Sequence, residues 1–187
     1  MPATKELTTD MEKLAEMIKG IRFAMMTTVQ PDGTMHSRPM ATQDAPFDGD
    51  LWFFTSVCSG KVHELQGDQH VNLAYADTES NRYVSISGIA KVVQDRRKAD
   101  ELWNAEVKAW FPKGVDDPDL GLIRVQVTEA QYWDAPSGRM TLLAKYARAI
   151  LTAERPQNVA EHRTIDFSKM PTADPLETYP RRSFLHG

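Results

Sequence analysis

Short apolar stretches, many of them alternating with polar residues, recur along the first 134 positions of the chain. This period of two is typical of strands that cover a core with one face. Between the first two stretches, Pro31, Asp32 and Gly33 combine a fixed φ with a residue that tolerates positive φ, which predicts a hairpin turn. The pattern predicts strands at 22–30, 34–43, 51–56, 71–77, 83–94 and 120–134.

Apolar residues three and four positions apart predict helices outside these strands. Near the N-terminus, Thr9 and Glu12 have the spacing of a capping box, and Gly20 is placed to end the helix. Further helices are expected at 61–66, 96–110 and 141–154.

The order of these elements predicts the fold class. Six strands follow one another at short spacing, and helices occur only between some of them, unlike a repeated strand-helix-strand unit. We therefore expect a mainly β, α+β fold, a six-stranded antiparallel β-barrel with flanking helices. Residues 1–140 would form this domain, and residues 141–187 a C-terminal helix and an extended, proline-containing tail.

Composition narrows the class of protein. A chain of 187 residues is long enough for one domain with a core, and its formal charge of -4 argues against a general nucleic-acid surface. No apolar run reaches the roughly 20 residues of a membrane span, and the N-terminal residues lack the apolar core of a secretory signal. We expect a cytoplasmic protein with no nucleic-acid or membrane partner. Cys58 is the single cysteine and is interpreted as a packing residue.

The segment "TSVCSGK", residues 55–61, carries the clearest candidate chemistry. It places the hydroxyls of Thr55 and Ser59 and the ammonium of Lys61 where a strand ends and a helix begins. Unpaired N–H groups at a helix start, together with a cation, suit a phosphate. Arg38 lies in the neighbouring hairpin and could supply a second cation to the same anion.

The same residues also fit an interpretation without any ligand. Ser59 would then be only an N-cap, Lys61 a solvated residue of the first turn, and Arg38 the partner of an acid. Spacing does not decide between the two interpretations. The histidines are scattered and predict no metal site, His36 is only a weak candidate acid or base, and the acids of the loop at 116–119 are interpreted as turn formers.

A series of motifs in order resembles a known family. The segments are "FAMMTTVQPDGTMHSRPM", "LWFFTSVCSGKVHEL", "VNLAYAD", "YVSISGIAKVVQD" and "LIRVQVTEAQYWDAPSG". They resemble the FMN-binding split-barrel proteins of the pyridoxamine 5'-phosphate oxidase-like superfamily, in particular the branch of general stress protein 26. The resemblance covers about residues 8–140 and implies a split β-barrel, FMN as cofactor and a homodimer with two FMN sites at its interface.

The resemblance also implies roles for individual residues. Arg38, Pro39 and Met40 would border the flavin, and Thr55, Ser56 and Lys61 would hold the phosphate of its ribityl chain. Trp133 would approach the flavin from the partner subunit. No catalytic side chain and no metal ligand are implied.

Three functions remain open on this basis. The leading hypothesis is a flavin-dependent oxidoreductase of the general stress type that acts on an unidentified small substrate. A non-catalytic protein that binds or buffers flavin is an alternative, and so is a barrel that has lost flavin and serves as an interaction module. Oxidation of pyridoxine 5'-phosphate is disfavoured, because the chain continues from Trp133 into residues 135–158 where true oxidases end in an Arg- and His-bearing segment.

Overall fold

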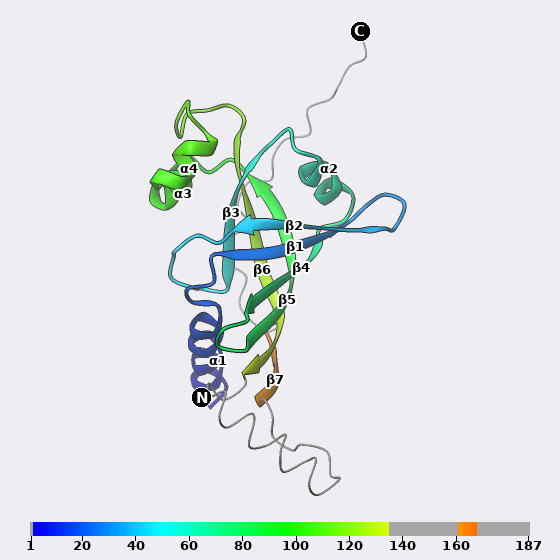
Figure 1. Ribbon diagram of the computed structural model, residues 1–187, viewed down its shortest axis with the longest axis vertical. Coiled ribbons are helices and arrows are strands. Elements are labelled where there is room, and N and C mark those ends of the chain that lie inside the picture. Colours follow the sequence, from blue (N-terminus) through cyan, green and yellow to red (C-terminus); the bar gives the residue numbers. More distant parts are fainter. Residues whose placement is uncertain (1, 135–160, 168–187) are drawn as a thin grey trace, which may run out of the picture.

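The computed structural model describes residues 2–134 and 161–167, with side chains from residue 8 onward. Strands dominate, as the alternating pattern predicts, and helices lie at the N-terminus and between some of the strands (Figure 1). The elements are α1 (Pro2–Ile18), β1 (Phe23–Val29), β2 (Met35–Ala41), β3 (Asp50–Ser56), α2 (Gly60–Gly67), β4 (His70–Asp77), β5 (Arg82–Val93), α3 (Arg96–Leu102), α4 (Ala105–Trp110), β6 (Leu120–Asp134) and β7 (Glu161–Asp166).

The described strands form one antiparallel sheet in the order β2-β1-β4-β5-β6-β3, with β7 added beside β6. Strand β6 has 15 residues, so its first half pairs with β3 and its last six residues pair with β7, while β5 pairs along its other edge. In Figure 1, β1 and β2 run across the direction of β3 and β6, so the sheet curls around its core. The predicted class, an antiparallel sheet with flanking helices in a barrel-like fold, is confirmed, and β7 is a strand that the sequence pattern did not reveal.

Two apolar clusters hold the described part of the chain together. The larger one fills the curled sheet, where α1 contributes Leu14 and Met17 and the segment around β7 contributes Ile165 and Phe167, all of them buried. Phe167 packs edge-on against Phe47, with ring centroids 6.2 Å apart. Because fully burying one such side chain is worth about 1.5–3 kcal/mol, Ile165 and Phe167 are part of the core and not merely attached to it.

The smaller cluster lies under α3 and α4 at one end of the sheet. Leu102 of α3 and Val107 of α4 pack there on Trp52 of β3 and Leu122 of β6. The two clusters share β3 and β6, because successive side chains of these strands point to opposite sides.

Two helix predictions need correction. Helix α1 begins at Pro2, so Thr9 lies inside the helix and is not its cap. The helix predicted over 96–110 is two helices, since Trp103 is extended and the side chain of Asn104 accepts hydrogen bonds from the backbone N–H groups of Glu106 and Val107. An Asn in this position starts a new helix more readily than it continues one. The helix predicted at 141–154 lies outside the described residues.

Over the described ranges, no helix combines the length and the apolar character that crossing a bilayer demands.

Candidate functional site

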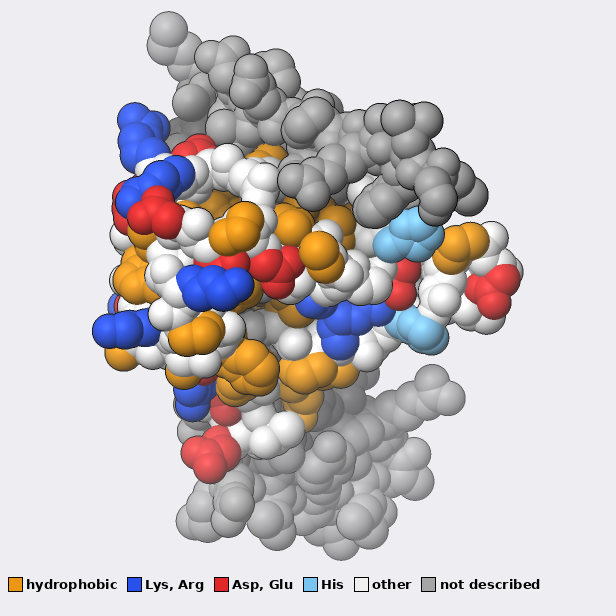
Figure 2. All heavy atoms as spheres, turned by 90° about the horizontal axis from the view of Figure 1, so that it is seen from above, with side chains coloured by type: hydrophobic (Ala, Val, Ile, Leu, Met, Phe, Trp, Pro, Cys, Tyr) orange, Lys and Arg blue, Asp and Glu red, His pale blue; other side chains and the backbone are white. Residues whose placement is uncertain are grey.

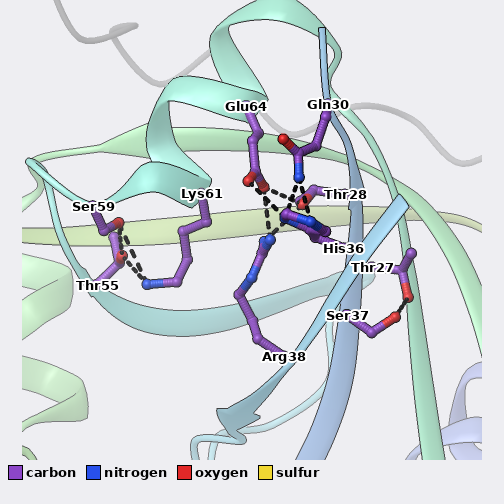
Figure 3. A network of polar contacts seen from close by, with 10 residues as sticks. All are labelled: Thr27, Thr28, Gln30, His36, Ser37, Arg38, Thr55, Ser59, Lys61 and Glu64. Carbon is purple, nitrogen blue, oxygen red and sulfur yellow. Dashed lines mark hydrogen bonds and ion pairs between the residues drawn. The ribbon is translucent and has the colours of Figure 1, made fainter. Parts of the chain in front are cut away.

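The first polar cluster lies where β3 ends and α2 begins. Lys61, in the first turn of α2, donates hydrogen bonds through Nζ to Thr55 Oγ1 at 3.2 Å and to Ser59 Oγ at 3.4 Å. The two hydroxyl oxygens are themselves 3.2 Å apart. Ser59 is the N-cap residue of α2, yet its hydroxyl makes no capping hydrogen bond, so it is directed at Lys61 and Thr55 (Figure 3).

Lys61 is a partly buried cation whose neighbours do not neutralise it. Burial lowers the pKa of Lys61 below its ordinary value, the positive charge of Arg38 lowers it further, and the charge of Glu64 opposes both effects. The ion pairs among the described residues do not include Lys61, and its hydrogen-bond partners are neutral hydroxyls. An unneutralised cation held among hydroxyl donors is suited to an anion, because a bound negative charge would offset the cost of burial.

A second cluster joins β1, β2 and α2 beside the first. Arg38 donates to Thr28 Oγ1 at 2.6 Å and to Glu64 Oε2 at 2.7 Å, and the hydroxyl of Thr28 also bonds to Glu64. Desolvation alone would raise the pKa of Glu64, but the hydrogen bonds from Thr28 and Arg38 outweigh it and hold the pKa below its ordinary value. His36 Nδ1 lies 3.6 Å from the second oxygen of Glu64.

The view onto this end of the molecule shows the mixture of charges. Basic, acidic and histidine side chains gather next to the β1–β2 hairpin (Figure 2). Figure 3 shows that Arg38 reaches toward Glu64, whereas Lys61 reaches toward Thr55 and Ser59. The two cations expected from the sequence are therefore neighbours, but only Lys61 lacks an ion-pair partner in the described structure.

Ser56 lies in a different environment from the one expected for a phosphate ligand. Its hydroxyl donates to Asp119 Oδ1 at 2.8 Å, and the backbone N–H of Cys58 is directed at the same oxygen at 3.3 Å. The hydroxyl of Ser59, and not that of Ser56, lies beside the Thr55 hydroxyl and the Lys61 ammonium; Ser56 offers Thr55 only its carbonyl oxygen, which accepts from Thr55 Oγ1 at 3.2 Å.

The remaining predicted residues are spread over the sheet. Met40 is buried on the core side of β2, and Pro39 faces outward on the opposite side. Trp133 lies near the far end of β6, where its ring stacks on His162 with centroids 4.9 Å apart. Thr55 pairs with Gly121, so twelve positions of β6, about 40 Å of strand, separate the Lys61 cluster from Trp133.

Sequence reasoning missed Thr28, Glu64 and Asp119. Glu64 follows Lys61 by three positions on α2, which places both on one helix face, and this spacing could have indicated it. Thr28 and Asp119 carry no such local signal. Among the described residues, no three His, Cys, Asp or Glu side chains are arranged to hold a metal ion.

Comparison with known proteins agrees with this fold. Residues 9–157 match the sequence model of the family described as pyridoxamine 5'-phosphate oxidase like. Protein bli-3 of Neurospora crassa is 32% identical over 162 residues, which cover 81% of this chain and 77% of that protein.

Solved structures of similar proteins share the architecture. A general stress FMN/FAD binding protein from Xanthomonas citri is 32% identical with a TM-score of 0.58, over 66% of this chain and 87% of that one. A general stress protein 26 from Jannaschia has a TM-score of 0.68 at 24% identity, over 87% of this chain and 99% of that one, and shows the fold alone.

The curled antiparallel sheet with flanking helices defines a protein of the split-barrel class. The chain belongs to the pyridoxamine 5'-phosphate oxidase-like family, and the general stress protein from Xanthomonas citri is among its relatives.

Proposed function

We propose that this protein binds FMN and that Lys61 holds its phosphate. The observation that carries the proposal is the partly buried ammonium of Lys61, which has two hydroxyl partners and no ion pair in the described structure. Thr55, Ser59 and Lys61 are donors of the kind a phosphate monoester requires. Membership of the family, and the FMN/FAD binding of the relative from Xanthomonas citri, support flavin as the molecule that carries the phosphate.

The flavin site would include residues of a second copy of the chain. Trp133, which the family resemblance assigns to the flavin, is too far along β6 to meet the Lys61 cluster of its own chain. A partner subunit could supply it. This argument supports a homodimer in which each site is shared.

The outward face of β1, β2, β4 and β5 is suited to such a dimer. Cross-strand pairing places sixteen side chains on this face, and none of them is Asp, Glu, Lys or Arg; the single histidine is His70, at the start of β4. Several are exposed and apolar, among them Phe23, Met25 and Tyr83, which are 48%, 42% and 40% exposed. An uncharged apolar surface of this extent is typical of a buried interface. The residues are Phe23, Met25, Thr27, Val29, Met35, Ser37, Pro39, Ala41, His70, Asn72, Ala74, Ala76, Tyr83, Ser85, Ser87 and Ile89.

Bound FMN would supply electron or hydride transfer, and the chain would bind and orient it. Arg38, fixed by Glu64 and Thr28, would border the flavin as one half of a stationary ion pair and not as a free cation. We propose a flavin-dependent oxidoreductase that acts on a small substrate still to be identified. A protein that only stores or buffers flavin remains the second candidate, because no general acid or base stands out beside Lys61 in the described structure.

Titration with FMN and riboflavin tests the phosphate site. The two ligands share the ring system, and only FMN has the phosphate. We expect the wild-type protein to bind FMN more tightly than riboflavin by at least about tenfold, the value of one charge-assisted hydrogen bond. Equal affinities would contradict the site.

A steady-state assay separates the two candidate functions. The FMN-loaded protein should consume a reduced nicotinamide in the presence of an electron acceptor if it is an oxidoreductase. It should oxidise pyridoxine 5'-phosphate at well below about 1 per second, the low end of ordinary enzyme rates. Flavin binding without turnover of any donor would favour the storage function.

Light scattering at micromolar concentration tests the shared site. Wild-type protein should have about twice the chain mass, and Met25→Glu should be monomeric and bind FMN weakly, because it buries a charge in the interface. Ala109→Glu, the same change of charge on the exposed side of α4, is the matched control and should remain dimeric. A Met25→Glu monomer with unchanged FMN affinity would exclude a site made by two subunits.

A further inference from the structure

Asp119 connects the site at Lys61 to the body of the sheet. This residue lies immediately before β6, in the acidic loop that sequence reasoning treated as a plain connection. Its carboxylate oxygen Oδ1 accepts hydrogen bonds from Ser56 Oγ at 2.8 Å and from the backbone N–H of Cys58 at 3.3 Å. Its backbone oxygen accepts a third, from the N–H of Val57 at 2.9 Å. One residue thus bonds to three consecutive residues, the last residue of β3 and the two that follow it.

These three residues determine where the anion-binding groups lie. The N–H of Ser59 bonds back to the carbonyl oxygen of Ser56 at 3.1 Å, so the position of Ser59 depends on the turn that Asp119 holds. Ser59 in turn presents its hydroxyl to Lys61. The turn is also packed tightly, since a Cβ on Gly121 would come within 2.7 Å of the side chain of Val57.

The charge of Asp119 argues against a direct role in holding an anion. A carboxylate repels a phosphate, so electrostatics alone would make Asp119 unfavourable near the site. The hydrogen bond from Ser56 lowers the pKa of Asp119, so the group is ionised at neutral pH. The unfavourable repulsion between Asp119 and a bound anion is offset if Asp119 stabilises the structure of the site. Its hydrogen bonds to residues 56–58 are such a stabilising contribution.

We propose that Asp119 is a positioning residue for the phosphate site, which it serves by fixing the turn that presents Ser59 and Lys61. The inference rests on the proposed function, and it assigns Ser56 an indirect role. The hydroxyl of Ser56 holds Asp119 and does not contact the phosphate.

The test compares FMN and riboflavin affinities of the full chain by fluorescence titration. Asp119→Ala should weaken FMN binding about 5- to 30-fold, the value of two hydrogen bonds, and leave riboflavin binding unchanged. Asp119→Asn keeps the acceptor oxygen and should stay within about threefold of the wild type. Asp116→Ala removes the same charge from the same loop and should behave as the wild type, because the ion pair of Asp116 in the described structure is with Arg96 and not with the 56–58 turn.

Each alternative gives a different outcome. If Asp119 acted through its charge, Ala and Asn would both strengthen FMN binding, which would overturn the positioning role. If Ser56 contacted the phosphate directly, Asp119→Ala would release its hydroxyl and FMN affinity would not fall, which would also overturn it. A wild type that binds FMN no more tightly than riboflavin would instead overturn the phosphate site itself and the inference with it.

Ser56→Ala is the second variant, in case Asp119→Ala does not fold. It removes one of the two hydrogen bonds to Oδ1 and should weaken FMN binding about 2- to 10-fold without affecting riboflavin. In the double variant Ser56→Ala/Asp119→Asn, the loss should not exceed that of Ser56→Ala alone, because both changes act on one bond. Unchanged FMN affinity in Ser56→Ala would contradict the inference.

Discussion

Two cations at the two ends of β3 have opposite surroundings. Arg124 of β6 lies beside Asp50 at the start of β3, with 2.7 Å between Arg124 Nη2 and Asp50 Oδ2, and the two side chains are only 9% and 10% exposed. Lys61 lies beside Thr55 near the end of the same strand, with hydroxyls around it and no ion pair in the described structure. One cation is neutralised within the chain, and the other has no ion-pair partner among the described residues.

The comparison sets a cation that is neutralised inside the fold against a cation that, on the proposed function, would bind the phosphate of a ligand. Asp50 and Arg124 are buried together, and the ring of Trp52 lies 6.0 Å from the guanidinium carbon of Arg124. Removing either partner leaves a buried charge without compensation, which is expensive. Lys61 already carries part of that cost, as its lowered pKa shows, so its removal costs the fold little.

The largest expected effect is on the free energy of unfolding, when the ion pair of Arg124 with Asp50 is broken. Arg124→Ala should lower the free energy of unfolding by about 3–5 kcal/mol in urea titrations, because Asp50 stays buried without its partner. Replacing both residues, as Arg124→Met with Asp50→Leu, should recover most of the loss. FMN affinity of the folded protein should be unchanged in both variants. A loss below about 1 kcal/mol in Arg124→Ala would show that solvent reaches Asp50 after all.

Replacing Lys61 should have the opposite effects: FMN affinity should fall, and the free energy of unfolding should hardly change. Lys61→Ala should weaken FMN binding by roughly 1.5–3 kcal/mol, or about 10- to 150-fold, since a charge-assisted bond to the phosphate is lost. The free energy of unfolding without flavin should move by no more than about 0.5 kcal/mol. Riboflavin, which lacks the phosphate, should bind both forms alike. Unchanged FMN affinity would show that Lys61 does not contact the phosphate and that the phosphate binds at another place.

The smallest effect is the pH dependence of stability. Desolvation raises the pKa of Asp50 above its ordinary 3.8, although Arg124 opposes the shift. The folded chain therefore binds a proton at Asp50 more readily than the unfolded chain does. The contribution of Asp50 to the free energy of unfolding grows as the pH falls toward 3.8. Glu64 has the opposite sign, because its pKa lies below 4.5 and its contribution is lost as the pH falls through that lowered value.

Urea titrations between pH 5 and pH 3 measure this difference. Stability should fall less steeply on acidification in Glu64→Gln than in the wild type, and more steeply in Asp50→Asn. Identical slopes in all three proteins would mean that neither carboxyl titrates differently in the folded and unfolded chains.

Much of the fold follows from local patterns in the sequence. The alternation of polar and apolar residues predicts six of the strands, and the turn at Pro31 to Gly33 fixes the β1–β2 hairpin. Strand β7 escaped prediction because Glu161 to Asp166, "EHRTID", has hardly any apolar residues to form a pattern. Its place is decided by pairing with β6 and by the burial of Ile165 and Phe167.

The candidate site divides in the same way. Sequence alone determined that Thr55, Ser59 and Lys61 would lie together, because they are within seven residues of one another at a strand-to-helix junction. It could not determine that Arg38 is neutralised by Glu64, or that Ser56 belongs to Asp119, 63 positions away along the chain. Hydrogen bonds between distant residues have no signature in spacing, since only the folded sheet brings β6 beside β3 and α2 beside the β1–β2 hairpin. The tertiary structure therefore decided that Arg38 has an ion-pair partner and that Lys61 has none among the described residues.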